Sequence, residues 1–414
     1  MGRLKFNDVA MNENNPLWEI MTERQGKLEK RVSDVRSPFA RDYTRILHST
    51  AYRRLKHKTQ VFYNIDNDHV CTRIEHVAHV ESVSDTIALE LGLNGELTRA
   101  IALGHDLGHA PFGHEGEDII NSLRVEYGIG GKFWHERNGV YFADNFELLR
   151  DSEDKLRNLC LTYAVRDGII SHCGEIDQNN LRTRTEYGDL YSLEKGTFNP
   201  GTWEACVVKV ADKIAYLGRD IEDAKRLNIL DNKAIGELKE ITRGVVNTTN
   251  IMGEMVGDIC RNSSPQQGIC FSKECENKIN KIKAYNYTYI YGSEKLKPFT
   301  RYAKLVLQEI ARFLDGAYDT KKGAIDWEYF KSRTQSQPLM IENFMQWLAT
   351  YAEEGTVDED LIAEYNLGEY VRNGNKKVYG NLSNKLAYDG AVLDFISGMT
   401  DRFAIESYEE LLKF

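Results

Sequence analysis

Histidine is the residue type that stands out in this sequence. Seven of its ten histidines fall between residues 69 and 135: His69, His76, His79, His105, His109, His114 and His135. Near neutral pH an imidazole can bind a metal ion or transfer a proton. A lone helical histidine is more often a core or surface residue, so each candidate needs suitable neighbours.

Two of these histidines have carboxylates that could join them in a metal site. His76 and His105 each lie on the apolar face of a predicted helix, and Asp106 follows His105 directly. A further carboxylate, Asp212, projects from the face opposite to the apolar one on a later helix. Taken alone, that opposite face is typical of solvated helix. Together, the four side chains could converge on one cation.

The order His76, His105 with Asp106, Asp212 resembles the H…HD…D pattern of the HD superfamily of metal-dependent phosphohydrolases. The surrounding strings look like those of bacterial deoxyguanosine triphosphate triphosphohydrolases, in the same order. They are SPFARDYTRILHSTAYRRLKHKTQVF, TRIEHVAHV, HDLGHAPFGHEGE, FWHERNG, VADKIAYLGRDIEDA and SGMTDRFA. The resemblance runs from about residue 37 to residue 405. Ala110 departs from it, because many relatives carry a second proline there, but this removes no reacting group.

The resemblance implies that His76, His105, Asp106 and Asp212 bind one divalent metal ion. Two imidazoles and two carboxylates form a mixed N/O site that suits Mn²⁺ or Mg²⁺, with Fe²⁺ or Ni²⁺ as alternatives. The implied reaction is hydrolysis of a deoxynucleoside triphosphate, dGTP being favoured, by attack at the α-phosphorus. Its products would be the deoxynucleoside and inorganic tripolyphosphate.

The leaving 5′-alkoxide is poor, so a proton donor is required near its oxygen. His114 is the candidate, and Glu117 lies three residues on, close enough at helical spacing to orient it. The resemblance supports this pair and adds His135, which could complete a proton relay or bind phosphate. We expect a structural role beside the metal for His109, and a structural or surface role for His172.

Substrate contacts are also implied by the resemblance. A triphosphate with about four negative charges needs cations, and Arg73 and Lys213 match phosphate-binding positions of the family. Gln60, Tyr216 and Asp220 resemble the residues that contact the deoxyribose. A tyrosine ring beneath C2′ would exclude a 2′-hydroxyl, while Asp220 and Gln60 could bond the 3′-hydroxyl.

Two other classes of function remain open. Another HD-superfamily reaction, by a phosphomonoesterase or cyclic-nucleotide phosphodiesterase, would use the same metal ligands without the string HAPFGHEGE or the Tyr216 and Asp220 pair. A non-catalytic nucleotide sensor, or a protein that binds single-stranded nucleic acid, could use residues 21–60, which hold 11 basic and 4 acidic side chains. The ordinary interpretation of that segment is a solvated helix face.

The net charge of −10 disfavours a large nucleic-acid-binding surface. The sequence has no apolar run of about 20 residues and no apolar leader, so we expect a cytoplasmic protein without a membrane span. The resemblance implies a homo-oligomer, a hexamer or another even number, and allows an activating nucleotide and single-stranded DNA as partners. Arg402 is a further candidate for phosphate binding or the subunit interface.

Helices must position these residues, so we expect an all-α HD-domain fold with small β-hairpin or strand insertions. One helical catalytic body would span residues 1–414, with the HD core at about 37–226 and a helical extension, 227–414, that completes the active site and the oligomer interface. Helices are predicted at 41–57, 74–91, 96–106, 115–126, 135–149, 154–168, 204–226, 233–260, 299–317 and 339–354. Residues 173–202 are predicted as a loop. A strand is predicted where tyrosines alternate: Tyr285, Tyr287, Tyr289 and Tyr291.

Overall fold

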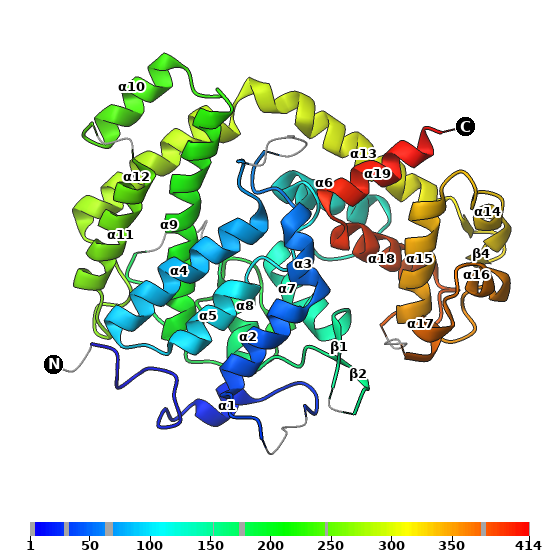
Figure 1. Cartoon of the computed structure of the whole chain (residues 1–414), viewed down its shortest axis with the longest axis horizontal. Coiled ribbons are helices and arrows are strands. Elements are labelled where there is room, and N and C mark those ends of the chain that lie inside the picture. The colour runs from blue at the N-terminus through cyan, green and yellow to red at the C-terminus, as the bar shows by residue number, and fades with distance from the viewer. Residues whose placement is uncertain are drawn as a thin grey trace.

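The computed structural model describes most of the chain and shows a mainly helical protein (Figure 1). The described residues are 5–28, 33–62, 69–151, 153–173, 179–244, 247–373 and 378–413. Within them the strands form two antiparallel two-stranded sheets, one of β1 (Leu148–Arg150) with β2 (Leu156–Asn158) and one of β3 (Tyr318–Asp319) with β4 (Ala324–Ile325). The predicted all-α class with small β insertions is therefore confirmed.

The central helix of the HD core is α5 (Gly95–Gly104), and it is buried along most of its length. Four helices pack around it: α2 (Pro38–His48), α4 (Arg73–Leu91), α8 (Tyr163–Ser171) and α9 (Trp203–Arg226). The contact with α8 is close, because a Cβ on Gly168 would lie 2.5 Å from Ile101 Cδ1. This packing places the N-terminal end of α4 and the C-terminal end of α5 beside the middle of α9.

Local sequence signals explain where these helices begin. A capping box formed by Thr72 and Glu75 begins α4, and the Asn94 side chain accepts a hydrogen bond from Leu97 N at the start of α5. The Thr202 side chain accepts one from Ala205 N at the start of α9. The metal-ligand candidates are therefore carried by well-terminated helices.

The remaining elements of the N-terminal half surround this core. They are α1 (Trp18–Thr22), α3 (Thr50–Arg54), η1 (Leu55–His57), α6 (Gly113–Glu126), α7 (His135–Asn145) and η2 (Leu190–Ser192). Of these, α7 packs on α8, whereas α6 packs on helices of the C-terminal half.

The residues after α9 contribute to two large hydrophobic clusters. The first cluster includes the HD core together with α10 (Asn232–Ile241), α11 (Thr248–Asn262), α12 (Lys273–Asn286) and the π-helical turn η3 (Tyr287–Tyr291). The turn η4 (Glu294–Leu296) then leads to α13.

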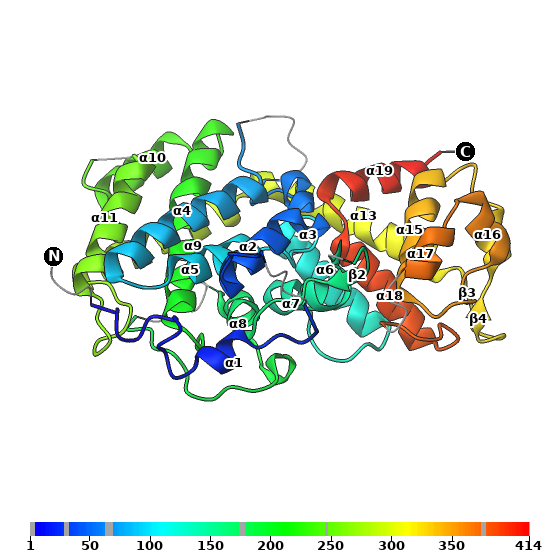
Figure 2. The same cartoon turned by 60° about the horizontal axis from the view of Figure 1, so that its bottom comes forward.

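The second cluster is built mainly from the helices that follow. They are α13 (Lys297–Asp315), α14 (Trp327–Lys331), α15 (Pro338–Tyr351), α16 (Glu359–Glu364), α17 (Gly368–Asn373), α18 (Lys385–Gly398) and α19 (Asp401–Leu411). Figure 2 shows α10 and α11 at one end of the molecule and α15 to α17 at the other, the end at which Figure 1 shows α14. Helix α6 contributes Phe112, Ile119 and Leu123, at and beyond its N-cap, to this cluster.

Several predicted elements are wrong in extent or type. The predicted helix 41–57 is interrupted at Ser49, which caps α3, and 233–260 is split between α10 and α11. The first part of 154–168 is instead the strand β2, in a segment with left-handed φ angles at Asp154 and Cys160.

The predicted tyrosine strand is also wrong. Residues Tyr285 to Tyr291 continue α12 into η3, because the segment packs as a helix against α9. The predicted loop 173–202 contains the short helix η2 and includes residues outside the described part of the chain. Among the described helices, none combines the length and the apolar character needed to cross a membrane.

Candidate active site

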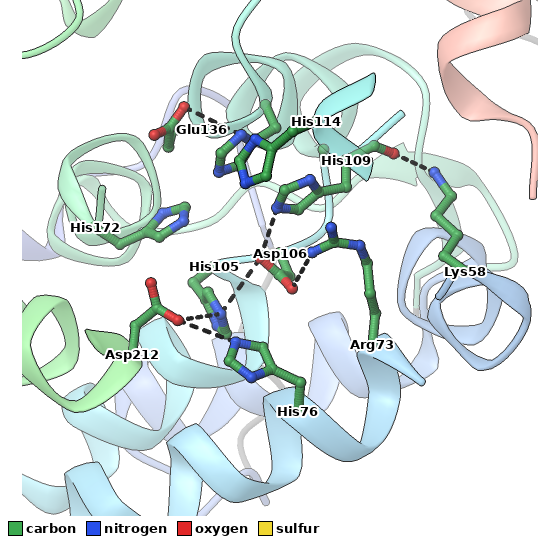
Figure 3. Close-up of polar contacts among 12 residues, drawn as sticks. Lys58, Arg73, His76, His105, Asp106, His109, His114, Glu136, His172 and Asp212 are labelled. Atoms are coloured by element: carbon green, nitrogen blue, oxygen red, sulfur yellow. Dashed lines mark hydrogen bonds and ion pairs between the residues drawn. The ribbon is translucent and has the colours of Figure 1, made fainter. Parts of the chain in front are cut away.

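The four predicted metal ligands meet where α4, α5 and α9 converge (Figure 3). His76 Nε2 lies 3.0 Å from Asp212 Oδ1, and His105 Nε2 lies 3.9 Å from the same oxygen. His105 Nε2 is 3.4 Å from Asp106 Oδ1. Coordinating atoms of His76, His105 and Asp212 all lie within 4.8 Å of one another. The structure thus brings together the predicted set.

The tautomer of His105 fits a metal ligand. Its Nδ1 lies 2.7 Å from the carbonyl oxygen of Ala102, which can only accept, so Nδ1 carries the proton of the neutral ring. Nε2 therefore presents a lone pair, and this buried nitrogen has no hydrogen-bond partner among the described residues. A cation beside Asp106 and Asp212 would satisfy it, so the residues present fit a divalent metal with N and O ligands.

Asp106 and Asp212, the two carboxylates among the four predicted metal ligands (the metal-ligand group), lie beside side chains that favour their ionised forms. Burial lowers the pKa of His76, but the hydrogen bond with Asp212 and the charges of Asp212 and Asp106 together raise the pKa overall. Burial raises the pKa of Asp106, but the nearby imidazoles and the Arg73 guanidinium hold it well below its ordinary value. Both carboxylates are thus ionised, as metal ligands must be, and metal binding would compete with a proton on His76.

Arg73 is a buried guanidinium aimed at this group. Only 1% of the residue is exposed, and Nη1 donates to Asp106 Oδ2 over 2.9 Å. Its Nε and Nη2 have no hydrogen-bond partner within the described part of the chain. Two unused N–H groups on a buried cation favour an anionic ligand such as phosphate.

A tight turn between α5 and α6 places the proton-transfer candidates. Phe112 and Gly113 both have left-handed φ angles, of 63° and 60°. A Cβ on Gly116 would lie 1.8 Å from Pro111 O, and one on Gly108 would lie 2.0 Å from Gly139 N. Glycine is therefore required where the turn packs against α6 and against α7, the helix that begins at His135.

Glu117 links the two histidines of the predicted relay. Its Oε2 lies 2.9 Å from His135 Nδ1 and 4.0 Å from His114 Nδ1. The His114 side chain is 60% exposed, whereas His135 is buried. Burial, followed by the charges of His172 and His114, lowers the pKa of His135 well below its ordinary value, so His135 is neutral.

The predicted sugar contacts form another part of the same cavity, whose volume is about 460 Å³. Tyr216 and Asp220 line it from α9 and Gln60 from the segment before α4. Gln60 Oε1 is buried and has no hydrogen-bond partner among the residues described. The hydroxyl of Tyr291, on η3, donates to Asp220 Oδ2, and burial raises the pKa of Asp220 to about 7.

Comparison with known proteins agrees with this geometry. An HD-domain family model matches residues 73–217, which include the four clustered ligands. The chain is also similar to curated proteins named deoxyguanosinetriphosphate triphosphohydrolase-like protein. With that of Caldanaerobacter subterraneus subsp. tengcongensis it shares 31% identity over 383 residues, covering 92% of this chain and 87% of the relative. The chain therefore belongs to the HD-domain family of deoxyguanosinetriphosphate triphosphohydrolase-like proteins.

Two further members of the family match over similar lengths. The relative from Pelagibacter ubique is 30% identical over 400 residues, which cover 95% of this chain and 98% of the relative. The relative from Rickettsia bellii is 29% identical over 405 residues, with coverage of 94% and 95%. The likeness to this HD family therefore spans both hydrophobic clusters.

Several cavity residues of this family member had no active-site role in the sequence-based prediction. His109 Nε2 lies 3.0 Å from Asp106 Oδ1, and its ring stacks on His135 with centroids 3.7 Å apart. His172 resembles His105 in that its Nδ1 lies 2.6 Å from the carbonyl oxygen three residues earlier, and burial lowers its pKa to about 4. Glu136 and Lys195 also line the cavity.

Lys195 adds a cation that the sequence did not reveal. Its Nζ lies 3.4 Å from Glu117 Oε1 and 3.5 Å from Glu136 Oε2. Burial raises the pKa of Glu136 to about 7. Lys195 lies in the predicted loop 173–202, where no periodicity or motif distinguished it.

Two predicted substrate-binding residues lie outside the residues that line the cavity. Lys213 is buried beside Asp212 on α9, and Arg402 is 68% exposed and pairs with Glu406 over 2.7 Å. Their roles stay predictions. Several cations of the basic segment 21–60 serve internal contacts, among them the pairs Arg24 with Asp42 and Arg54 with Glu147.

Proposed function

We propose that the protein hydrolyses deoxynucleoside triphosphates, with dGTP favoured, to the deoxynucleoside and inorganic tripolyphosphate. The names of its relatives support this class of substrate. The observation that carries the proposal is that one cavity is lined by ligands of the metal-ligand group, by the histidine and glutamate group, and by the predicted sugar contacts. Each group serves a different part of such a substrate.

His76, His105, Asp106 and Asp212 would hold the divalent cation, which polarises a phosphate and lowers the pKa of water when bound. Arg73 would bind the polyphosphate, because its unused N–H groups are buried and its charge is already fixed close to the metal-ligand group. Burial lowers the pKa of His109, so this ring stays neutral and adds no competing cation beside Asp106.

His114 would donate the proton that the 5′-oxygen gains when the bond to the α-phosphorus breaks. Its exposure at the cavity allows it to exchange protons with solvent between turnovers. Glu117 would orient His114 for the transfer, and its 2.9 Å contact with His135 holds the carboxylate in place.

Tyr216, Asp220 and Gln60 would select the sugar. The Tyr216 ring beneath C2′ would exclude a ribonucleotide, and Gln60 Oε1 is an unused buried acceptor suited to the 3′-hydroxyl. The Tyr291 hydroxyl donates to one oxygen of Asp220 and leaves the other for the sugar.

Product analysis tests the proposal. Purified protein with Mn²⁺ would be incubated with each of the four dNTPs and with GTP, and phosphates would be separated by ion-exchange chromatography. Tripolyphosphate and deoxyguanosine should appear in equal amounts from dGTP. Orthophosphate or pyrophosphate would indicate a different HD reaction, and dGTP binding without products would indicate a nucleotide sensor.

The Asp212→Asn variant is the matched control for contaminating phosphatases. It removes a ligand charge and should abolish tripolyphosphate release, while a contaminant would persist in both preparations. Adding each dNTP as a second nucleotide would show whether an activating nucleotide is required.

A further inference from the structure

The string SGMTDRFA near the C-terminus reaches the active site through Asp401. This residue begins α19, yet only 5% of it is exposed. Its Oδ1 accepts a hydrogen bond from Phe112 N over 2.8 Å. Its Oδ2 accepts two from Thr59, over 3.0 Å from the backbone N and 2.6 Å from Oγ1. One carboxylate therefore joins two segments far apart in the sequence.

Both segments end in residues of the cavity. Thr59 directly precedes Gln60, the predicted sugar contact, and Phe112 is two residues before His114, the predicted proton donor. Phe112 has a φ of 63°, a left-handed conformation that a residue with a side chain rarely adopts unless its surroundings hold it. The hydrogen bond to Asp401 fixes the position of the Phe112 N–H group.

A buried lysine strengthens the same junction. The Lys58 ammonium donates to the carbonyl oxygen of His109, and it lies 3.4 Å from the carbonyl oxygen of Ser397 on α18 (Figure 3). Lys58 is 2% exposed, and burial lowers the pKa of its ammonium group well below the ordinary value, while the charge of Asp401 opposes that shift. The turn that leads to α6 is thus held at Phe112 by Asp401 and at His109 by Lys58, which links it to α18.

We propose that Asp401 is a positioning residue through which the C-terminal helices set the placement of Gln60 and His114 in the cavity. The inference rests on the proposed hydrolysis and deepens it, because it assigns turnover and sugar selectivity to a residue that touches neither substrate nor metal. Placement errors of about 1 Å can lower rates by about 100-fold, so loss of this junction should be visible in kcat.

The first variant is Asp401→Ala, compared with wild type for kcat, for the ratio of dGTP to GTP hydrolysis, and for bound Mn²⁺. We expect kcat to fall by about 100-fold and the ratio to fall by about tenfold, with bound metal unchanged. The metal should remain because the hydrogen bonds of Asp401 go to Thr59 and Phe112, and neither of these residues is one of the four predicted metal ligands.

Asp389→Ala is the matched control. Asp389 is another buried carboxylate of the C-terminal helices, 2% exposed and paired with Lys385, and within the described part of the chain it makes no hydrogen bond or ion pair with either active-site segment. Its loss should lower the melting temperature while kcat and the dGTP to GTP ratio stay within about twofold of wild type. A general loss of stability would instead affect both variants alike.

Milder variants keep the test decisive if Asp401→Ala does not fold. Asp401→Asn keeps one acceptor oxygen, and Thr59→Val removes the hydroxyl donor alone. The two should lower kcat non-additively, since they share one contact. Wild-type kcat and selectivity in the folded variants would overturn the inference. No tripolyphosphate from wild type would instead overturn the proposed function.

Discussion

Replacing His114 with alanine should separate turnover from metal binding. The His114 side chain is 60% exposed and lies 4.0 Å from Glu117, outside the group formed by His76, His105 and Asp212. Its removal therefore leaves the metal-ligand group untouched. What it removes is the proposed proton donor to the leaving oxygen.

The expected magnitude follows from exposure and role. An exposed ion pair contributes at most about 1 kcal/mol to stability, so the melting temperature of His114→Ala should change little. General acid catalysis contributes about 100- to 10,000-fold, so kcat should fall by that factor, equivalent to about 2.7–5.4 kcal/mol in the barrier. Bound Mn²⁺ should stay near the wild-type value.

His105→Ala should behave in the opposite way. The ring is completely buried, its Nδ1 bond to Ala102 would be lost, and Asp106 and Asp212 would face each other with one imidazole fewer. We expect loss of bound metal and activity together. His48→Ala removes an exposed histidine of α2 and serves as the control that keeps both.

Metal content by elemental analysis and kcat from tripolyphosphate release would be measured on the same preparations. Adding a leaving group that needs no proton, such as a nitrophenolate ester, should restore part of the His114→Ala rate. Equal metal loss in His114→Ala and His105→Ala would refute the division of roles. So would a His114→Ala kcat above one tenth of wild type.

Three other outcomes follow from the described contacts. Burial raises the pKa of Asp394 from 3.8 to about 7, so the folded state holds a proton that the unfolded state releases, and stability falls as pH rises from about 4 to 7. Asp394→Asn should therefore raise the free energy of unfolding at pH 8, by about 4 kcal/mol at most, and change it little at about pH 4 in urea titrations; equal effects at both pH values would contradict this. Tyr216→Ala should lower the dGTP to GTP selectivity about 10- to 100-fold in competition assays, and an unchanged ratio would remove Tyr216 from sugar selection. Chelation with EDTA should abolish hydrolysis and Mn²⁺ should restore it, and activity that persists after verified metal removal would contradict a metal-dependent reaction.

The metal-ligand group could be predicted because its signals are local. His76 and His105 follow helical spacing on apolar faces, and both helices were predicted within a few residues of their ends. Asp212 was ambiguous, because a polar helical face has the same pattern whether it meets water or a polar cavity. Its surroundings, including the buried Asp220, depend on contacts between distant segments.

Other active-site residues gave no local signal. Lys195 lies in a segment without periodicity, and His172 could not be distinguished from a structural histidine until its Nδ1 bond to Ile169 O was seen. Tyr291 was placed on a strand, since alternation of aromatic residues over a few positions does not distinguish a strand from a π-helical turn packed on α9. Tertiary packing decided each case.

The boundary between the two hydrophobic clusters shows how the C-terminal half bears on the candidate active site. The helices beside the predicted metal ligands belong to the first cluster, whereas α6, which carries His114 and Glu117, packs on α13 and α18 of the second. The predicted metal ligands and the proposed proton donor are therefore held by different cores, joined at the turn to which Asp401 bonds. Because the proposed reaction needs both groups at one phosphate, the second cluster would act on it through distance and orientation rather than by supplying a metal ligand.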